Sequence, residues 1–141
     1  MKKVVSLFGV GIVLIAIVCF SGKVNAMESY FKSSLVSLAA GQHHGIIMDD
    51  CPYRYHQGGA LATVQPSDSV YIYWHLYEKT LFNRYAEKKF DRINNLTTKN
   101  WKSTSSFGLG DGDFAQQFDA VGGSYTGNVE ALNSPVNNPK V

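Results

Sequence analysis

The sequence has little charge and almost no cysteine. Charged residues make up 17% and hydrophobic residues 45% of the 141 residues, a balance that excludes disordered, collagen-like and coiled-coil chains. The formal net charge is +2, but residues 1–26 hold three lysines and no acidic residue, which leaves ten basic against 11 acidic residues in the remainder. Such a near-neutral domain lacks the basic surface of a nucleic-acid-binding protein, so the sequence predicts no nucleic-acid partner.

The scarcity of cysteine excludes a small domain held together by internal disulfides. There are two cysteines, Cys19 in an apolar N-terminal segment and Cys51 in the following domain. The domain therefore depends on an ordinary hydrophobic core. Three interpretations of Cys51 stay open: a small buried apolar residue, an intermolecular disulfide, or a reactive thiol.

The common cofactor and hydrolase motifs are also missing. The glycine-rich stretch Gly108–Gly112 lacks the Lys-Ser/Thr pair of a phosphate-binding loop, and there is neither a Gly-x-Ser-x-Gly nor a His-Glu-x-x-His motif. We therefore expect no cofactor, and these absences favour a non-enzymatic function over an enzyme.

The clearest pattern present is a bacterial secretory signal peptide. Lys2 and Lys3 precede an apolar run over residues 4–20, and Val24 and Ala26 have the small or short side chains that signal peptidase accepts. The pattern predicts cleavage near Ala26 and a secreted protein, extracellular or periplasmic, that meets the membrane only during export. An uncleaved membrane anchor is the competing interpretation. We expect one globular domain over residues 27–132 and a flexible tail over residues 133–141.

Hydrophobic spacing predicts a small α+β domain. Apolar residues at helical intervals favour helices over Ser29–Ala40 and Glu78–Ile93, with Gln42–Gly59 as an irregular polar segment. The pattern also predicts a β-hairpin formed by Ala60–Val64 and Ser69–Tyr77. The fold expected is a small antiparallel sheet packed against one or two helices, and the alternative is an all-β sandwich.

Two further segments bear on the choice between these folds. Residues 78–93 would instead form a strand pair if the chain turned near Ala86–Lys88, and the sandwich alternative depends on that. Beyond Leu96 the Ser-, Thr- and Gly-rich composition predicts short strands, with turns at Gly122-Gly123 and Thr126–Asn128.

The strand Ser69–Tyr77 offers a candidate binding surface. Its alternate side chains are aromatic or imidazole, and such rings on a sheet can stack on sugars or enter a protein interface. The competing interpretation is that a helix covers this side and that the rings belong to the core. The candidate binding residues, including two tyrosines earlier in the chain, are Tyr71, Tyr73, His75, Tyr77, Tyr53 and Tyr55.

A dense group of possible metal ligands precedes that strand. Imidazole, carboxylate and thiolate groups together suit Zn²⁺ or Cu²⁺, but their spacing matches no standard zinc motif. The competing interpretation is a polar surface loop, so we assign no metal and keep these residues as candidates. They are His43, His44, Asp50 and His56. The glycine-rich turn with Asp111, Asp113 and Asp119 is a similar candidate for Ca²⁺, without the spacing of an EF-hand.

A thiol nucleophile is the remaining chemical possibility. Cys51 paired with a histidine such as His75 would form a thiolate–imidazolium pair of the kind that thiol hydrolases use.

The function predicted is that of a secreted, non-enzymatic bacterial binding protein. Its partner would be an extracellular protein, a glycan or a component of the cell envelope. One alternative is a secreted antibacterial protein or toxin of the bacteriocin kind, and another is a small thiol hydrolase that uses Cys51 and a histidine.

Overall fold

The computed structural model describes residues 29–139, which form nine β-strands and no helix. The strands are β1 (Tyr30–Leu38), β2 (His43–Cys51), β3 (Tyr55–Ala62), β4 (Tyr71–Lys79), β5 (Tyr85–Ile93), β6 (Lys102–Ser103), β7 (Phe107–Gly108), β8 (Gly112–Val121) and β9 (Tyr125–Ser134).

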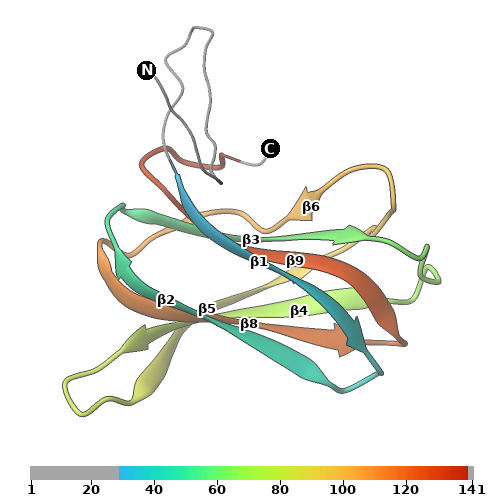
Figure 1. The fold of residues 1–141 in the computed structure, drawn as a ribbon, viewed down its shortest axis with the longest axis horizontal. Helices are drawn as coiled ribbons and strands as arrows, with labels where there is room; N and C mark the ends of the chain where they lie inside the picture. The colour runs from blue at the N-terminus through green and yellow to red at the C-terminus, as the bar shows by residue number, and fades with distance from the viewer. Residues whose placement is uncertain (1–28, 140–141) are drawn as a thin grey trace, which may run out of the picture.

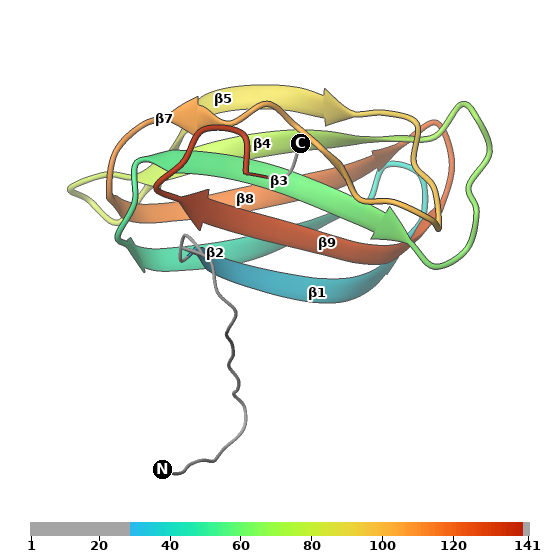
Figure 2. The ribbon, with the colours of Figure 1, turned by 90° about the horizontal axis from the view of Figure 1, so that it is seen from above.

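The strands build two antiparallel sheets that pack face to face (Figures 1 and 2). Sheet A has the order β1-β9-β3-β6, with β7 also paired to β3. Sheet B has the order β2-β8-β4-β5. Because consecutive strands such as β1 and β2 lie in different sheets, the chain crosses repeatedly between the layers, as in other β-sandwiches.

The core lies between the sheets and is filled by alternate side chains of both. Trp74 of β4 and Phe114 and Phe118 of β8 are fully buried from sheet B, and Tyr125 and Val129 of β9 are fully buried from sheet A. The period of two along β4 and β8 places every second residue in this layer and the residues between them on the outer face. Because one set of alternate side chains of β4 and β8 is buried in the core, the other set necessarily lies on the outer face of sheet B.

The expected α+β fold is wrong, and the all-β sandwich, our alternative, describes the protein. Ser29–Ala40 contains β1 instead of a helix. Phe31 and Leu35, which belonged to the expected helical stripe, are exposed on the outer side of sheet A, whereas Val36 and Leu38 are buried with a period of two. Pairing of β1 with β9 satisfies this backbone and overrides the local spacing.

The helix expected over Glu78–Ile93 is also wrong, because this segment forms the end of β4, a turn and β5. The strand pair that we held as the alternative is confirmed, but its turn lies at Thr80–Arg84, before Ala86–Lys88. The N–H of Thr80 donates to the carbonyl oxygen of Arg84 at 2.6 Å, and Asn83 takes a left-handed conformation with φ of 57°. Asparagine tolerates that conformation better than most residues, which favours a turn at this point.

Of the other predicted strands and turns, some are confirmed and some are wrong. The strand over Ser69–Tyr77 is confirmed by β4, which lies between β8 and β5 in sheet B. The hairpin with Ala60–Val64 is wrong, because that segment belongs to β3 in the other sheet. Gly122-Gly123 does form a turn, with φ of 81° and 156°, whereas Thr126–Asn128 lies within β9.

The polar segment Gln42–Gly59 is likewise strand where an irregular segment was expected. Its short apolar run is part of β2, in which Ile46 and Met48 are buried beside β8. At the other end of the chain, β9 extends to Ser134, and the side chain of Asn138 accepts a hydrogen bond from the N–H of Ser106 at 2.8 Å.

The signal peptide expected over residues 1–26 lies outside the described residues. Within residues 29–139 there is no helix long and apolar enough to cross a bilayer.

Candidate functional site

The outer face of sheet B carries a cluster of polar and aromatic side chains. On β4 the alternation that buries Ile72, Trp74 and Leu76 turns the intervening residues outward, where they are partly exposed. No described residue forms a helix that would cover them. We call this surface the sheet B face. Its β4 side chains are Tyr71, Tyr73, His75 and Tyr77.

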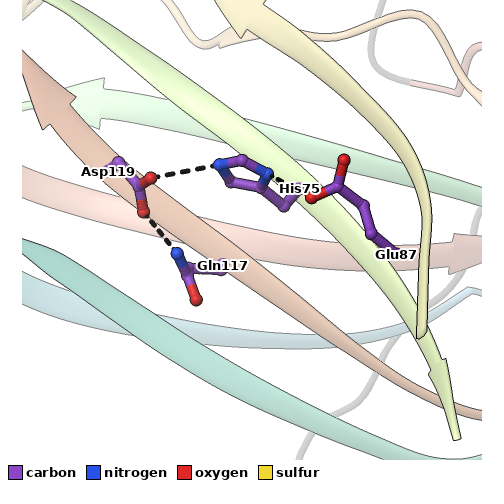
Figure 3. Close-up of polar contacts among 4 residues, drawn as sticks. All are labelled: His75, Glu87, Gln117 and Asp119. Carbon is purple, nitrogen blue, oxygen red and sulfur yellow. Dashed lines mark hydrogen bonds and ion pairs between the residues drawn. The ribbon is translucent and has the colours of Figure 1, made fainter. Parts of the chain in front are cut away.

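The imidazole of His75 stands at the centre of this face, between two carboxylates (Figure 3). Its Nδ1 lies 2.9 Å from Oε1 of Glu87 on β5, and its Nε2 lies 3.1 Å from Oδ2 of Asp119 on β8. Because a carboxylate only accepts, both contacts are hydrogen bonds only when the imidazole carries a proton on each nitrogen. The positive ring then balances one of the two negative charges and links three neighbouring strands.

A fourth residue fixes the far carboxylate. The amide Nε2 of Gln117 donates to Oδ1 of Asp119 at 2.8 Å (Figure 3). Asp119 is therefore held through both oxygens, one by His75 and one by Gln117. We call His75, Glu87, Asp119 and Gln117 the imidazole–carboxylate cluster.

Aromatic rings surround this cluster. The ring of Tyr73 meets His75 edge to face at a centroid distance of 4.7 Å, and the ring of Tyr77 lies nearly parallel to His75 at 6.0 Å. Phe90 of β5 lies 5.6 Å from Tyr73, and the guanidinium of Arg92 is 4.4 Å above the ring of Tyr71. These contacts are worth about 0.5–1.5 kcal/mol each and hold the rings in place while leaving part of each ring accessible.

Beside the cluster the sheet B face is hollowed. The hollow has a volume of about 370 Å³ and opens to solvent. Small residues, Gly45 of β2 and Ala115 of β8, lie between larger ones, and the side chains of Tyr77 and Tyr85 come from β4 and β5. The other lining residues are Ile47, Gln116 and Gln117. Gln117 thus borders the hollow and also supports the imidazole–carboxylate cluster.

The electrostatics of the hollow are set by the nearby carboxylates. Partial burial raises the pKa of the Tyr77 phenol, and the negative charges of Glu87 and Asp119 raise it further. The phenol therefore stays protonated at neutral pH and keeps its O–H as a hydrogen-bond donor. The two carboxylates and the amide oxygen of Gln117 keep lone pairs beyond their contacts within the imidazole–carboxylate cluster, and those can accept hydrogen bonds from hydroxyl groups.

The structure does not bring all the predicted binding residues together. Tyr71, Tyr73, His75 and Tyr77 share the sheet B face. Tyr55 instead begins β3 in sheet A, and Tyr53 lies in the connection between β2 and β3. There Tyr55 packs near the guanidinium of Arg54, at 5.7 Å.

The metal candidates are dispersed as well. His43 and His44 begin β2, whereas Asp50 lies at its other end, where its N–H donates to Oδ1 of Asp113 at 2.8 Å. His56 is buried on β3, with Nε2 2.8 Å from the carbonyl oxygen of Gly110. Within residues 29–139 no three histidine, cysteine or acidic side chains are placed to share a metal ion.

Cys51 is inside the molecule. Its thiol donates to the carbonyl oxygen of Met48 at 3.2 Å, and burial, with the negative charges of Asp113 and Asp49, raises its pKa to about 12. Because the thiolate is the nucleophile, this environment disfavours thiol chemistry. His75 is on the outer face of sheet B, bonded to its two carboxylates, while Cys51 packs in the core.

Several site residues were absent from the predicted set. Glu87, Phe90 and Tyr85 fell within the expected helix, and Gln117 was not singled out. Asp119 was noticed only as a possible calcium ligand. The period-two alternation of β8 is a signal that could have found Gln117 and Asp119, whereas the exposure pattern of β5 shows no such alternation.

Comparison with known proteins adds the fold only. No protein-family model matches the chain, and neither does any curated protein. A protein of Sulfurospirillum deleyianum, known from its crystal structure, is similar with a TM-score of 0.51, 8% sequence identity, and coverage of 74% of this chain and 97% of that one. At that identity the likeness concerns the β-sandwich architecture alone.

Proposed function

We propose that this is a secreted, non-enzymatic binding protein that recognises a glycan of the bacterial cell envelope through the sheet B face. The observation that carries the proposal is the open hollow beside the imidazole–carboxylate cluster, with Tyr77 and Tyr85 among its lining residues. Its volume, about 370 Å³, lies within the range of small-ligand sites.

The chemistry of this surface suits a sugar. A pyranose ring has an apolar face of C–H groups that stacks on an aromatic ring, and a rim of hydroxyls that bond to carboxylates and amides. Tyr77 and Tyr85 offer rings, and Gln117, Glu87 and Asp119 offer polar groups in fixed positions. Because hydrogen bonds already order the imidazole–carboxylate cluster, little conformational entropy is lost there when a ligand binds.

The thiol-hydrolase alternative receives less support. The buried Cys51 with its raised pKa offers no accessible thiolate, and the accessible His75 has two carboxylates as partners. A secreted antibacterial protein stays open, because attachment to an envelope glycan would also be the first step of such an activity. Growth inhibition of bacterial cultures is the additional readout that separates a lethal from a passive binding protein.

The test is binding to insoluble peptidoglycan and to an array of immobilised bacterial polysaccharides. Tyr85→Ala removes an exposed ring of the hollow, and we expect about a tenfold loss of affinity, the equivalent of roughly 1.4 kcal/mol for one stacking contact. Glu87→Gln removes one carboxylate, and we expect a loss of similar size. Phe31→Ala is the matched control, because Phe31 is an exposed ring on the outer side of sheet A.

Two outcomes would overturn the proposal. One is that no glycan in either format binds the protein. The other is that Tyr85→Ala and Phe31→Ala weaken binding equally, which would mean that general surface apolarity, and no feature of the sheet B face, is responsible.

A further inference from the structure

The turn between β4 and β5 exposes two large apolar side chains at its tip. Leu81 is 98% and Phe82 is 83% exposed, the two largest values among the exposed large hydrophobic residues of the described chain. Figures 1 and 2 both show this turn projecting beyond the ends of the two sheets. Single exposed apolar residues are common, but two adjacent ones at the apex of a projecting hairpin call for a partner.

We propose that this hairpin tip inserts into the surface of an anionic lipid bilayer. The tip is convex and narrow, and the two apolar side chains stand at its apex. A protein interface usually needs a broad complementary surface of about 800 Å² on each partner, which two side chains at a tip cannot supply. A bilayer needs no preformed complement, because lipid closes around any apolar projection.

The backbone of the turn is suited to a low-dielectric surface. The N–H of Thr80 donates to the carbonyl oxygen of Arg84, and the N–H of Asn83 donates to the carbonyl oxygen of Thr80 at 3.2 Å. Part of the polar backbone is therefore already paired within the turn, which reduces the cost of placing it against lipid.

Charge at the base of the hairpin favours an anionic surface. Lys79 is the last residue of β4, and Arg84 immediately precedes β5, so the two cations flank the tip. Of the acidic groups beside the turn, Glu78 pairs with Lys88 at 3.6 Å. Asp113 accepts the N–H of Asp50 at 2.8 Å and keeps its negative charge, so with the two cations Lys79 and Arg84 the base of the hairpin keeps an excess of positive charge. When the apolar tip enters the acyl boundary, the two cations lie at the level of the lipid headgroups, where each gains from a negative surface potential.

This inference is separate from the glycan proposal, since it uses other residues. It departs from the sequence prediction, which allowed membrane contact only during export. Both surfaces share the β4–β5 hairpin, so insertion of the tip would hold the sheet B face close to the membrane.

Vesicle binding tests the proposal. Protein secreted by a bacterial host would be mixed with vesicles of phosphatidylcholine alone and vesicles with 30% phosphatidylglycerol, and bound protein measured by flotation. We expect binding to the anionic vesicles that falls at least about tenfold in the L81S/F82S variant, given the apolar area lost. Leu35→Ser is the matched control, since Leu35 is 71% exposed on sheet A, and it should bind as the unchanged protein does.

A second measurement reports whether the tip itself enters the lipid, independently of any other segment that contacts the vesicle. In the F82W variant we expect the added indole to shift its emission to the blue with anionic vesicles and to be quenched by brominated lipid. The unchanged protein, with Trp74 and Trp101 as its tryptophans, provides the background spectrum. An unshifted, unquenched indole, or equal binding by L81S/F82S and the unchanged protein, would overturn the inference. So would equal binding to both vesicle types, or cross-linking of the tip to a protein in place of lipid.

Discussion

Gly58 of β3 lies against the indole of Trp74, and the space between them leaves no room for a methyl group. A Cβ at position 58 would stand 2.3 Å from both Cδ1 and Nε1 of that ring. The indole cannot easily move away. Its Nε1–H donates to Oε1 of Gln116 at 2.7 Å, and the ring stacks on Phe107 at 5.7 Å with 15° between the planes. Gly58→Ala therefore forces a displacement of the largest fully buried side chain in the core.

The expected cost follows from two effects. Overpacking of a filled core costs about 1–3 kcal/mol. Displacement of the indole also breaks its bond to Gln116, whose Nε2 already has no partner among the described residues, and a lost buried hydrogen bond costs about 1 kcal/mol more. We expect a loss of roughly 3 kcal/mol of unfolding free energy, a large share of the stability of a small domain.

Urea unfolding monitored by circular dichroism measures this loss. Gly45→Ala is the matched control, because an added Cβ there meets no atom within 4 Å, and it should change stability little. Trp74→Phe removes part of the obstructing ring, so in its background Gly58→Ala should cost clearly less. A loss below about 1 kcal/mol for Gly58→Ala, or an equal loss for Gly45→Ala, would refute the packing argument.

Three further predictions concern buried or strained groups. Because the pKa of the Cys51 thiol is raised to about 12, the native protein should react with iodoacetamide at pH 8 roughly 10³-fold more slowly than the protein unfolded in guanidinium. Similar rates for the native and the unfolded protein would contradict the burial of Cys51. Burial lowers the pKa of His56 below 6.5, so the unfolded chain binds the proton first, and stability should fall as pH drops below about 6.5. In His56→Gln this fall should be smaller, as measured by urea unfolding at pH 7.5 and 5.5. Because Asn83 has φ of 57°, Asn83→Ala should lower the melting temperature while Asn83→Gly should not, and the reverse order would contradict the turn geometry.

A strand could be predicted from the sequence where its apolar residues alternate with a period of two and the apolar residues are the buried ones. In β4 this holds: the alternation of Ile72, Trp74 and Leu76 with outward residues was visible in the sequence, and both the strand and its two faces are as predicted. In β1 this does not hold, because the apolar Phe31 and Leu35 face solvent. Exposed apolar residues on a strand can imitate a helical stripe, and only the pairing with β9, nearly a hundred residues later, settles the matter.

The sequence likewise predicted only part of the candidate site. The outward residues of β4 followed from alternation, but the partners of His75 come from other strands. Glu87 is 12 residues away along the chain and Asp119 is 44. Neither separation leaves a local pattern, and the first was hidden by the expected helix. Pairing of β4 with both β5 and β8 is the information that sequence spacing did not contain.

A bulge explains how Glu87 reaches His75. Along β4 and β5 the register runs from Leu76 opposite Lys89 to Tyr77 opposite Glu87, so Lys88 is an extra residue on β5. In an unbulged ladder, Tyr77 would oppose Lys88, and Glu87 would point to the inner side of the sheet. The extra residue reverses the alternation from that point and turns Glu87 outward, onto the same face as His75. The imidazole–carboxylate cluster thus depends on one inserted residue, Lys88. Bulges often redirect a side chain at a functional site, and this one lies beside the hollow.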